Sequence, residues 1–241
     1  GYTNLYGKLF SKYISESINY LEIGLGTLDP SIPSTFVGNP SHYPHYKPAG
    51  ILRAWKEYFE NAHIYGIDVA EDCMISDDKI TTYLLDSTDK HACDNLLSNI
   101  SFDIILDDGL HTSDAQIKTF RNFFSKVNDG GFYVIEDIGG GDGLNVWTEH
   151  RSEISESISG HEYFYGGNVL IVRKNSSGRG ELTFDQFNIE EDLSLLPESS
   201  CGDLTIVSGL WDINRVGRDW ARYQEHFDKF LKIPCNMILW V

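Results

Sequence analysis

Residues 20–27 read Tyr-Leu-Glu-Ile-Gly-Leu-Gly-Thr, an apolar strand that runs directly into a pair of glycines. Gly24 and Gly26 permit a sharp turn, and they allow a ligand to approach the backbone closely. A plain tight turn explains the two glycines equally well. The stretch therefore predicts a strand followed by a tight loop, with a bound ligand as one of two interpretations.

Apolar runs of strand length alternate with amphipathic stretches over residues 1–174. The further predicted strands are 63–69, 79–85, 102–106, 132–135 and 168–172. Helical spacing marks 51–58 and 115–127, and a turn is expected at 130–131. This alternation is typical of an α/β fold with a Rossmann-like, doubly wound, mostly parallel sheet. Ligands of such sheets bind at the carboxyl ends of the strands.

Acidic residues end the next two predicted strands. Asp68 could accept hydrogen bonds from both hydroxyls of a ribose. It lies farther from Gly24 than the roughly 20 residues of a dinucleotide fingerprint, and the third glycine of that motif is missing, which disfavours a pyrophosphate site. Asp86 and Ser87 stand where nucleoside-binding α/β folds commonly place the base. A cap on the following helix is an equally good interpretation of Asp86.

Two acidic clusters follow neighbouring predicted strands. Asp107, Asp108 and His111 follow the run FDIIL, and Glu136 with Asp137 follows FYVI. Adjacent parallel strands would bring both clusters to one edge, where carboxylates repel unless their pKa values rise or a cation binds. Oxygen ligands favour Mg²⁺, Ca²⁺ or Mn²⁺ over zinc. His111 could then remove a proton from a bound hydroxyl, although a solvated or helix-capping histidine is the simpler alternative.

Two loops are candidates for covering this edge. His42 and His45 lie in an aromatic, proline-rich segment, 41–48, which we interpret as an active-site lid or substrate wall rather than a metal site. The glycine-rich run 139–143 could form a second lid, and a plain flexible loop is the competing interpretation.

Composition excludes several classes of protein. The chain has 241 residues, of which 41% are hydrophobic and 23% charged, so disorder is not its main state. A net charge of −17 disfavours nucleic acids and anionic membranes. No apolar run approaches the roughly 18 residues of a membrane span. The four cysteines lack CxxC spacing and there is no signal-peptide pattern, which predicts free thiols and a cytoplasmic location.

On these motifs the chain resembles the class I S-adenosylmethionine-dependent methyltransferases. Within that class it is similar to the metal-dependent sugar O-methyltransferases of the macrocin and mycinamicin type. The resemblance covers residues 2–174 and rests on YLEIGLGT, GILRAWKEYF, IYGIDV, FDIILDDGLH and GGFYVIEDI. The glycine loop with the acidic end of the second strand is generic to the superfamily. DDGLH paired with IED is the specific part.

The resemblance implies a methyl transfer from S-adenosylmethionine to a hydroxyl of a sugar in a glycan or glycoside, assisted by Mg²⁺. It implies cofactor contacts from Glu22, Gly24, Gly26, Asp68, Asp86, Ser87 and Asp107. It implies Mg²⁺ ligands at Asp108, Glu136 and Asp137, with His111 as the general base and Asp108 as its catalytic neighbour. The long segment 28–48 departs from the shortest family pattern, which leaves its role and the acceptor's identity open. Relatives usually have residues before 2–6, so part of a cofactor lid would lie outside this chain.

Two other functions stay open from the sequence. One is a metal-dependent methyltransferase for a catechol or another vicinal diol, which needs a flatter acceptor slot. The other is an inactive methyltransferase-like module that holds a glycosyltransferase in place, which the complete set of acidic and histidine residues argues against. Which sugar and which hydroxyl is methylated is not specified by any pattern in the sequence.

The remaining residues suggest a different unit. We expect a methyltransferase domain at 1–174, a polar linker at 175–202 and a strand–helix–strand segment at 203–241. That last segment resembles the opening βαβ unit of lipopolysaccharide-biosynthesis glycosyltransferases of the HtrL type, and an ordinary C-terminal extension is the alternative. It ends in an apolar run, which suggests a fragment with a glycosyltransferase domain following in the same polypeptide. An exposed sheet edge there would allow a homo-oligomer.

Overall fold

The computed structural model describes residues 2–37, 46–138, 158, 160–166, 168–174, 180–181, 201–209 and 235–240. The chain divides into two compact units, Gly1–Phe187 and Asn188–Val241. His42, His45 and the glycine run 139–143 lie outside the described residues, as does most of the predicted linker. The domain boundaries expected from the sequence therefore stay a prediction.

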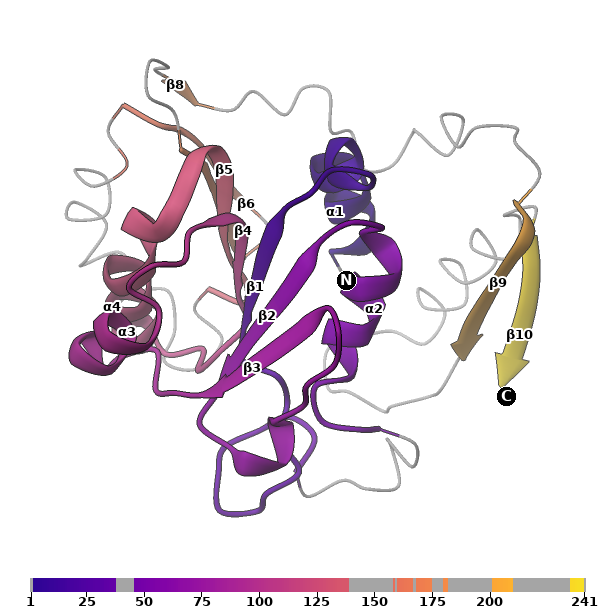
Figure 1. Ribbon diagram of the computed structural model, residues 1–241, viewed down its shortest axis with the longest axis horizontal. Coiled ribbons are helices and arrows are strands. Elements are labelled where there is room, and N and C mark those ends of the chain that lie inside the picture. The colour runs from indigo at the N-terminus through magenta and orange to yellow at the C-terminus, as the bar shows by residue number, and fades with distance from the viewer. Residues whose placement is uncertain are drawn as a thin grey trace. The chain divides into compact units, whose positions relative to one another are not determined.

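The first unit is built on an eight-stranded sheet with the order β3-β2-β1-β4-β5-β7-β6-β8 (Figure 1). Its first five strands pair in parallel, and β7 runs antiparallel to both β5 and β6. The strands are β1 (Asn19–Ile23), β2 (His63–Asp68), β3 (Ile80–Leu84), β4 (Phe102–Asp107), β5 (Val127–Ile135), β6 (Glu162–Gly166), β7 (Val169–Arg173) and β8 (Gly180–Glu181). The predicted Rossmann-like, mostly parallel sheet is confirmed.

Helices cover both faces of this sheet. α1 (Thr3–Phe10) and α2 (Gly50–Tyr58) pack on one face, and α3 (Lys90–Leu96) and α4 (Ser113–Phe123) on the other (Figure 1). Each face has its own apolar core, because helix residues every three or four positions meet the alternate residues of the strands. Short 3₁₀ turns add η1 (Ser11–Tyr13), η2 (Glu71–Cys73) and η3 (Phe124–Lys126). In the described part of the chain no helix is long and apolar enough to cross a membrane.

The order in which the chain adds strands reverses between β1 and β4, although these two strands are parallel. From β1 the chain proceeds outward to β2 and β3, and it then returns to place β4 on the other side of β1. The amide of Asp108 donates to the carbonyl of Ile23 at 2.9 Å, and the amide of Gly24 donates to Ile67 at 3.0 Å. The glycine loop and the DDGLH segment are thus neighbours at the switch point, where α/β folds bind ligands.

The predicted turn at 130–131 is wrong, because these glycines lie inside β5. The strand begins at Val127, where the sequence suggested the end of a helix, and its register with β4 shifts between Phe102 and Ile104. Gly130 has a φ of 80°, and a Cβ on Gly131 would lie 2.6 Å from the carbonyl oxygen of Asp103. The glycines therefore mark an irregularity within a strand, which sequence alone does not distinguish from a turn.

The second unit contains two described strands, β9 (Cys201–Gly209) and β10 (Cys235–Trp240). They pair in parallel, with a register shift between Cys235 and Asn236. Parallel neighbours require a crossover connection, which usually contains a helix. The two predicted strands are confirmed, and the predicted helix between them lies outside the described residues.

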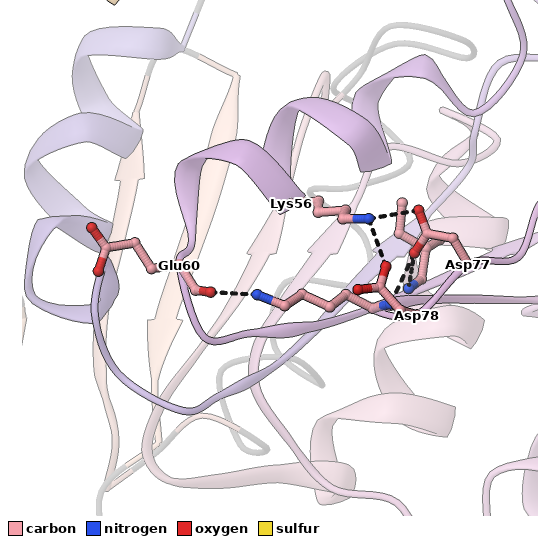
Figure 2. Close-up of polar contacts among 6 residues, drawn as sticks. Lys56, Glu60, Asp77 and Asp78 are labelled. Atoms are coloured by element: carbon pink, nitrogen blue, oxygen red, sulfur yellow. Dashed lines mark hydrogen bonds and ion pairs between the residues drawn. The ribbon is translucent and has the colours of Figure 1, made fainter. Parts of the chain in front are cut away.

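An ionic cluster ties α2 to the turn between β2 and β3 (Figure 2). The Nζ of Lys56 lies 2.8 Å from carboxylate oxygens of both Asp77 and Asp78. The Nζ of Lys79 donates to the carbonyl of Glu60 at 2.6 Å, just beyond the end of the helix. Lys56, together with the backbone amides of Lys79 and Ile80, holds the pKa of Asp77 at about 2.

We expect Lys56→Met to raise the pKa of Asp77 toward its ordinary value. The ammonium group contributes most to the shift, whereas the backbone amides remain in the variant. The stability gained from the ionised carboxylate is present above its ordinary pKa and is lost as the pH falls through the folded pKa near 2. The variant, whose folded pKa lies closer to the ordinary value, has less of this stability, and it loses all of it at a higher pH. Carboxyl carbon NMR titration measures this pKa. Lys118→Met, which removes the partner of Asp114 on α4, is the matched control and should leave Asp77 unchanged.

Candidate active site

The glycine loop after β1 is held in an unusual conformation. Gly24 and Gly26 have φ values of 87° and 74°, in the left-handed region that favours glycine. A Cβ on Gly24 would lie 2.3 Å from the carbonyl oxygen of Asp108, so the two loops touch through their backbones. This contact leaves no room for a side chain at Gly24.

Two acidic residues hold the same loop from the side of β2. Asp68 accepts the amide of Leu25 at 2.7 Å on one oxygen and the amide of Ala70 at 2.9 Å on the other. Asp72 accepts the Thr27 hydroxyl at 2.5 Å and the amide of Leu28 at 2.8 Å. The sequence pointed to Asp68 as a ribose ligand, and the structure shows that it also supports the loop. The sequence contains no signal for the role of Asp72, whose partners lie more than 40 positions away.

An aromatic pair packs against the outer side of the loop. The rings of Phe36 and Tyr46 stack with centroids 3.8 Å apart. The Tyr46 hydroxyl donates to the carbonyl of Gly26 at 2.7 Å and lies 3.1 Å from that of Leu25. Both residues belong to the long segment whose role the sequence left open. They place that segment beside the predicted cofactor loop.

Glu22 is buried beneath the loop, with 2% of its surface exposed. Its Oε2 accepts hydrogen bonds from the Tyr20 hydroxyl and from the indole of Trp55, the latter at 3.0 Å. Burial raises the pKa of Glu22 well above its usual range, and Asp108 and Glu136 act in the same direction, while the two donors lower it. Trp55, whose ring also packs against that of Tyr20, therefore positions this carboxyl group.

Asp86 and Ser87 follow β3, as predicted, but their side chains have local partners. Asp86 accepts the amide and the hydroxyl of Thr88, at 2.8 and 2.7 Å. Asp89, not Asp86, caps α3 by accepting the amide of Ala92. The Ser87 hydroxyl lies 2.8 Å from that of Thr119 on α4. Their contact with an adenine stays a prediction.

Three predicted site residues come together at the ends of β4 and β5. Ligand atoms of Asp108, His111 and Asp137 lie within 4.8 Å of one another. His111 Nε2 is 3.6 Å from Asp108 Oδ1, and the side chains of His111 and Asp108 are 31% and 41% exposed. His111 Nδ1 is buried and has no hydrogen-bond partner among the described residues. Asp137 adopts a φ of 48°, a strained value for a residue other than glycine.

Glu136 is not part of this group of three. Its Oε1 accepts a hydrogen bond from the Tyr6 hydroxyl, and its carbonyl accepts the side-chain amide of Gln116 at 2.8 Å. The Tyr2 hydroxyl reaches Asp137 Oδ1 at 2.9 Å. Burial, and then the neighbouring carboxylates, raise the pKa of Tyr6, so its hydroxyl stays protonated and donates. Tyr2 and Tyr6 could not be predicted as site residues from the sequence, because nothing local links them to residues 130 or more positions away.

Asp107 lies behind the group and faces the core. It is 2% exposed and accepts the amide of Gly109 at 3.3 Å and the hydroxyl of Tyr133 at 3.4 Å. Burial raises the pKa of Asp107 to about 7, and its hydrogen bonds partly oppose the change. Its local role is to hold the start of the DDGLH loop, and the cofactor contact expected from the resemblance stays a prediction.

The residues present fit a divalent cation. Burial and the charges of Glu136 and Asp137 raise the pKa of Asp108. A bound cation would offset the repulsion among these carboxylates. The carboxylate oxygens of Asp108 and Asp137 suit Mg²⁺ or Mn²⁺, and the imidazole of His111 lies beside them. Asp108 and Asp137 are the residues placed to hold it, with Glu136 directly adjacent.

The curated proteins that this chain resembles include several O-methyltransferases. The chain is 30% identical over 138 residues to 8-demethyl-8-alpha-L-rhamnosyl tetracenomycin-C 2'-O-methyltransferase of Streptomyces olivaceus, covering 57% of this chain and 33% of the relative. It is 32% identical over 138 residues to demethylmacrocin O-methyltransferase of Streptomyces fradiae, covering 57% and 31%. The chain thus spans about a third of the length of these curated relatives. No protein-family model matches it.

A solved structure shows the same fold. It is the MycE methyltransferase from the mycinamycin biosynthetic pathway in complex with Mg, SAH and mycinamycin VI, with a TM-score of 0.59 and 25% identity over 72% of this chain and 49% of that one. The chain has the class I methyltransferase fold. Its relatives are sugar O-methyltransferases, as the motifs predicted. In this methyltransferase fold the glycine loop and the acidic group flank the switch point from opposite sides.

Proposed function

We propose that this chain carries an S-adenosylmethionine-dependent, Mg²⁺-assisted O-methyltransferase activity toward a hydroxyl of a sugar in a glycan or glycoside. The observation that carries the proposal is the grouping of Asp108, His111 and Asp137 directly beside the Gly24 loop, at the switch point of a methyltransferase fold. Two of its relatives have a rhamnosyl compound as the substrate in their names, which supports a sugar acceptor.

The proposed donor site is the glycine loop and its supports. Gly24 and Gly26, whose left-handed φ values shape the loop, would lie beside the methionine and ribose part of the donor, together with Glu22. Asp68, whose oxygens already accept two amides, would use its remaining lone pairs for ribose hydroxyls. Asp86, Ser87 and Asp107 complete the set of proposed donor-site residues.

The proposed acceptor site is the acidic group. When bound by Asp108, Asp137 and Glu136, Mg²⁺ would act as a Lewis acid that makes a sugar hydroxyl more acidic. His111 lies beside Asp108 and would take the proton as the hydroxyl oxygen attacks the methyl group. The bond between that methyl carbon and the donor sulfur would break, and S-adenosylhomocysteine would leave. The Asp108 carboxylate would stabilise the positive charge that His111 gains with the proton. The backbone contact between the two loops would keep donor and acceptor aligned.

Titration of S-adenosylhomocysteine into the protein, first with Mg²⁺ and then with EDTA, tests this proposal. We expect similar affinity under both conditions, because the donor loop and the acidic group are separate sets of residues. Methyl transfer to a panel of rhamnosides should be lost in EDTA and restored by Mg²⁺. Catechol in the same panel distinguishes a flat diol acceptor from a sugar.

Two outcomes would contradict the proposal. Full activity in EDTA would mean that methyl transfer does not require Mg²⁺. A protein that binds no S-adenosylhomocysteine in either condition would favour the alternative of an inactive module.

We propose finer features for the rest of the chain as well. Residues 203–241 form the start of a glycosyltransferase-like unit, which the parallel pairing of β9 and β10 supports. A cytoplasmic location is supported by the free, buried thiols of Cys73 and Cys93. A homo-oligomer would have to be detected by sedimentation or light scattering.

A further inference from the structure

The helix before β1 reaches the carboxylates at the end of β5. Tyr2 is the N-cap residue of α1 and Tyr6 lies four positions farther on, one turn into the helix, with the two ring centroids 6.0 Å apart. Their hydroxyls bond to consecutive residues, Tyr2 to Asp137 Oδ1 and Tyr6 to Glu136 Oε1. Two tyrosines one helical turn apart therefore bond to two consecutive carboxylate residues, Glu136 and Asp137, of the proposed metal site.

The Tyr6 ring is held firmly by its neighbours. It is 8% exposed, stacks on Phe10 with centroids 5.4 Å apart and lies 6.1 Å from the ring of Trp55. Trp55 in turn donates to Glu22 beneath the glycine loop. Rings fixed in this way can hold a hydroxyl in place at small entropic cost, since little rotational freedom is left to lose.

The segment that Tyr6 contacts needs such support. Asp137 has a positive φ, so the backbone at this turn is strained and depends on surrounding contacts. Gln116 of α4 holds the Glu136 carbonyl from one side of the sheet, and Ile138 donates to Asn168 at 2.9 Å. Among these contacts only Tyr2 and Tyr6 engage the carboxylates themselves.

We propose that Tyr6 is a positioning residue for metal binding: its hydroxyl orients the Glu136 carboxylate, with Tyr2 doing the same for Asp137, so that α1 sets the geometry of the metal carboxylates. The inference rests on the proposed function and deepens it. Groups that hydrogen-bond to metal ligands typically change metal affinity by about 10–100-fold when removed. Tyr6, which is buried, should have the larger effect, and Tyr2, which is partly exposed, the smaller.

Mn²⁺ binding followed by electron paramagnetic resonance tests the role of Tyr6 without any turnover. Tyr6→Phe keeps the stacked ring and deletes only the hydroxyl, and we expect its Mn²⁺ affinity to fall by about 10–100-fold. Tyr13→Phe is the matched control, because that hydroxyl bonds to the Gly130 carbonyl and to no site residue. S-adenosylhomocysteine affinity should stay the same in both variants, which separates positioning from loss of folding.

A double-mutant cycle shows whether Tyr6 acts through Glu136. In a Glu136→Gln background, Tyr6→Phe should weaken Mn²⁺ binding by less than about twofold further. The inference is overturned if Tyr6→Phe binds Mn²⁺ as tightly as Tyr13→Phe, or if its full effect persists in that background. A wild-type protein that binds no Mn²⁺ overturns the metal-assisted function itself, and the positioning role with it.

Discussion

Asp108→Asn should abolish methyl transfer while leaving the fold and the donor site intact. The substitution preserves shape but removes the charge that the proposed cation needs, and Asp108 is the member of the group nearest to His111. Loss of Lewis-acid assistance costs several kcal/mol of transition-state stabilisation. At 1.36 kcal/mol for each tenfold change, this corresponds to a fall in kcat of roughly 10³–10⁴-fold.

The backbone of Asp108 explains why donor binding should survive this change. Its amide bonds to Ile23 and its carbonyl lies against Gly24, and neither contact uses the side chain. S-adenosylhomocysteine affinity should therefore stay within about threefold of the wild type, in keeping with the modest effect of substitutions away from a ligand. Asp114→Asn, which removes a carboxylate paired with Lys118 on the surface of α4, is the matched control. Turnover that persists in Asp108→Asn would exclude the acidic group as the acceptor site.

The strands that build the site could be predicted from sequence because their signal is local. β1, β2, β4 and the end of β5 are short apolar runs, each followed by glycine or acidic residues. The parallel arrangement then follows from the helices between them. α1, α3 and β6 were not predicted, since each is a short segment with few aliphatic residues. Gly130 was misinterpreted because a glycine in a strand irregularity and a glycine in a turn share the same backbone preference.

In the candidate site, too, residues with a local sequence pattern could be predicted, whereas contacts between residues far apart in the sequence could not. Asp108, His111 and Asp137 were predicted together because consecutive parallel strands end at one edge of a sheet. Sequence could not show that Glu136 turns toward Tyr6, because a hydrogen bond across 130 positions leaves no pattern in either segment. The contact of Trp55 with Glu22 could not be predicted for the same reason, because 33 positions separate the two residues.

Gly24→Ala should be the most destabilising of the substitutions considered. A Cβ at this position would lie 2.3 Å from the carbonyl oxygen of Asp108 and 2.7 Å from the Cα of Gly109. These are backbone atoms at the ends of paired strands, so they can move only if β1 and β4 separate. Adding the strain of a φ of 87°, we expect a loss of about 4 kcal/mol or more in the free energy of unfolding. Urea unfolding measures it.

Gly130→Ala separates the two contributions to this cost. Its φ of 80° is nearly the same, but a Cβ there would meet nothing within 4 Å. The control should therefore lose only about 1–2 kcal/mol, the cost of the backbone strain alone. The difference between the two variants measures the close approach of the glycine loop to the DDGLH loop. Equal losses would mean that the two loops do not touch, and the proposed alignment of donor and acceptor would then have no structural basis.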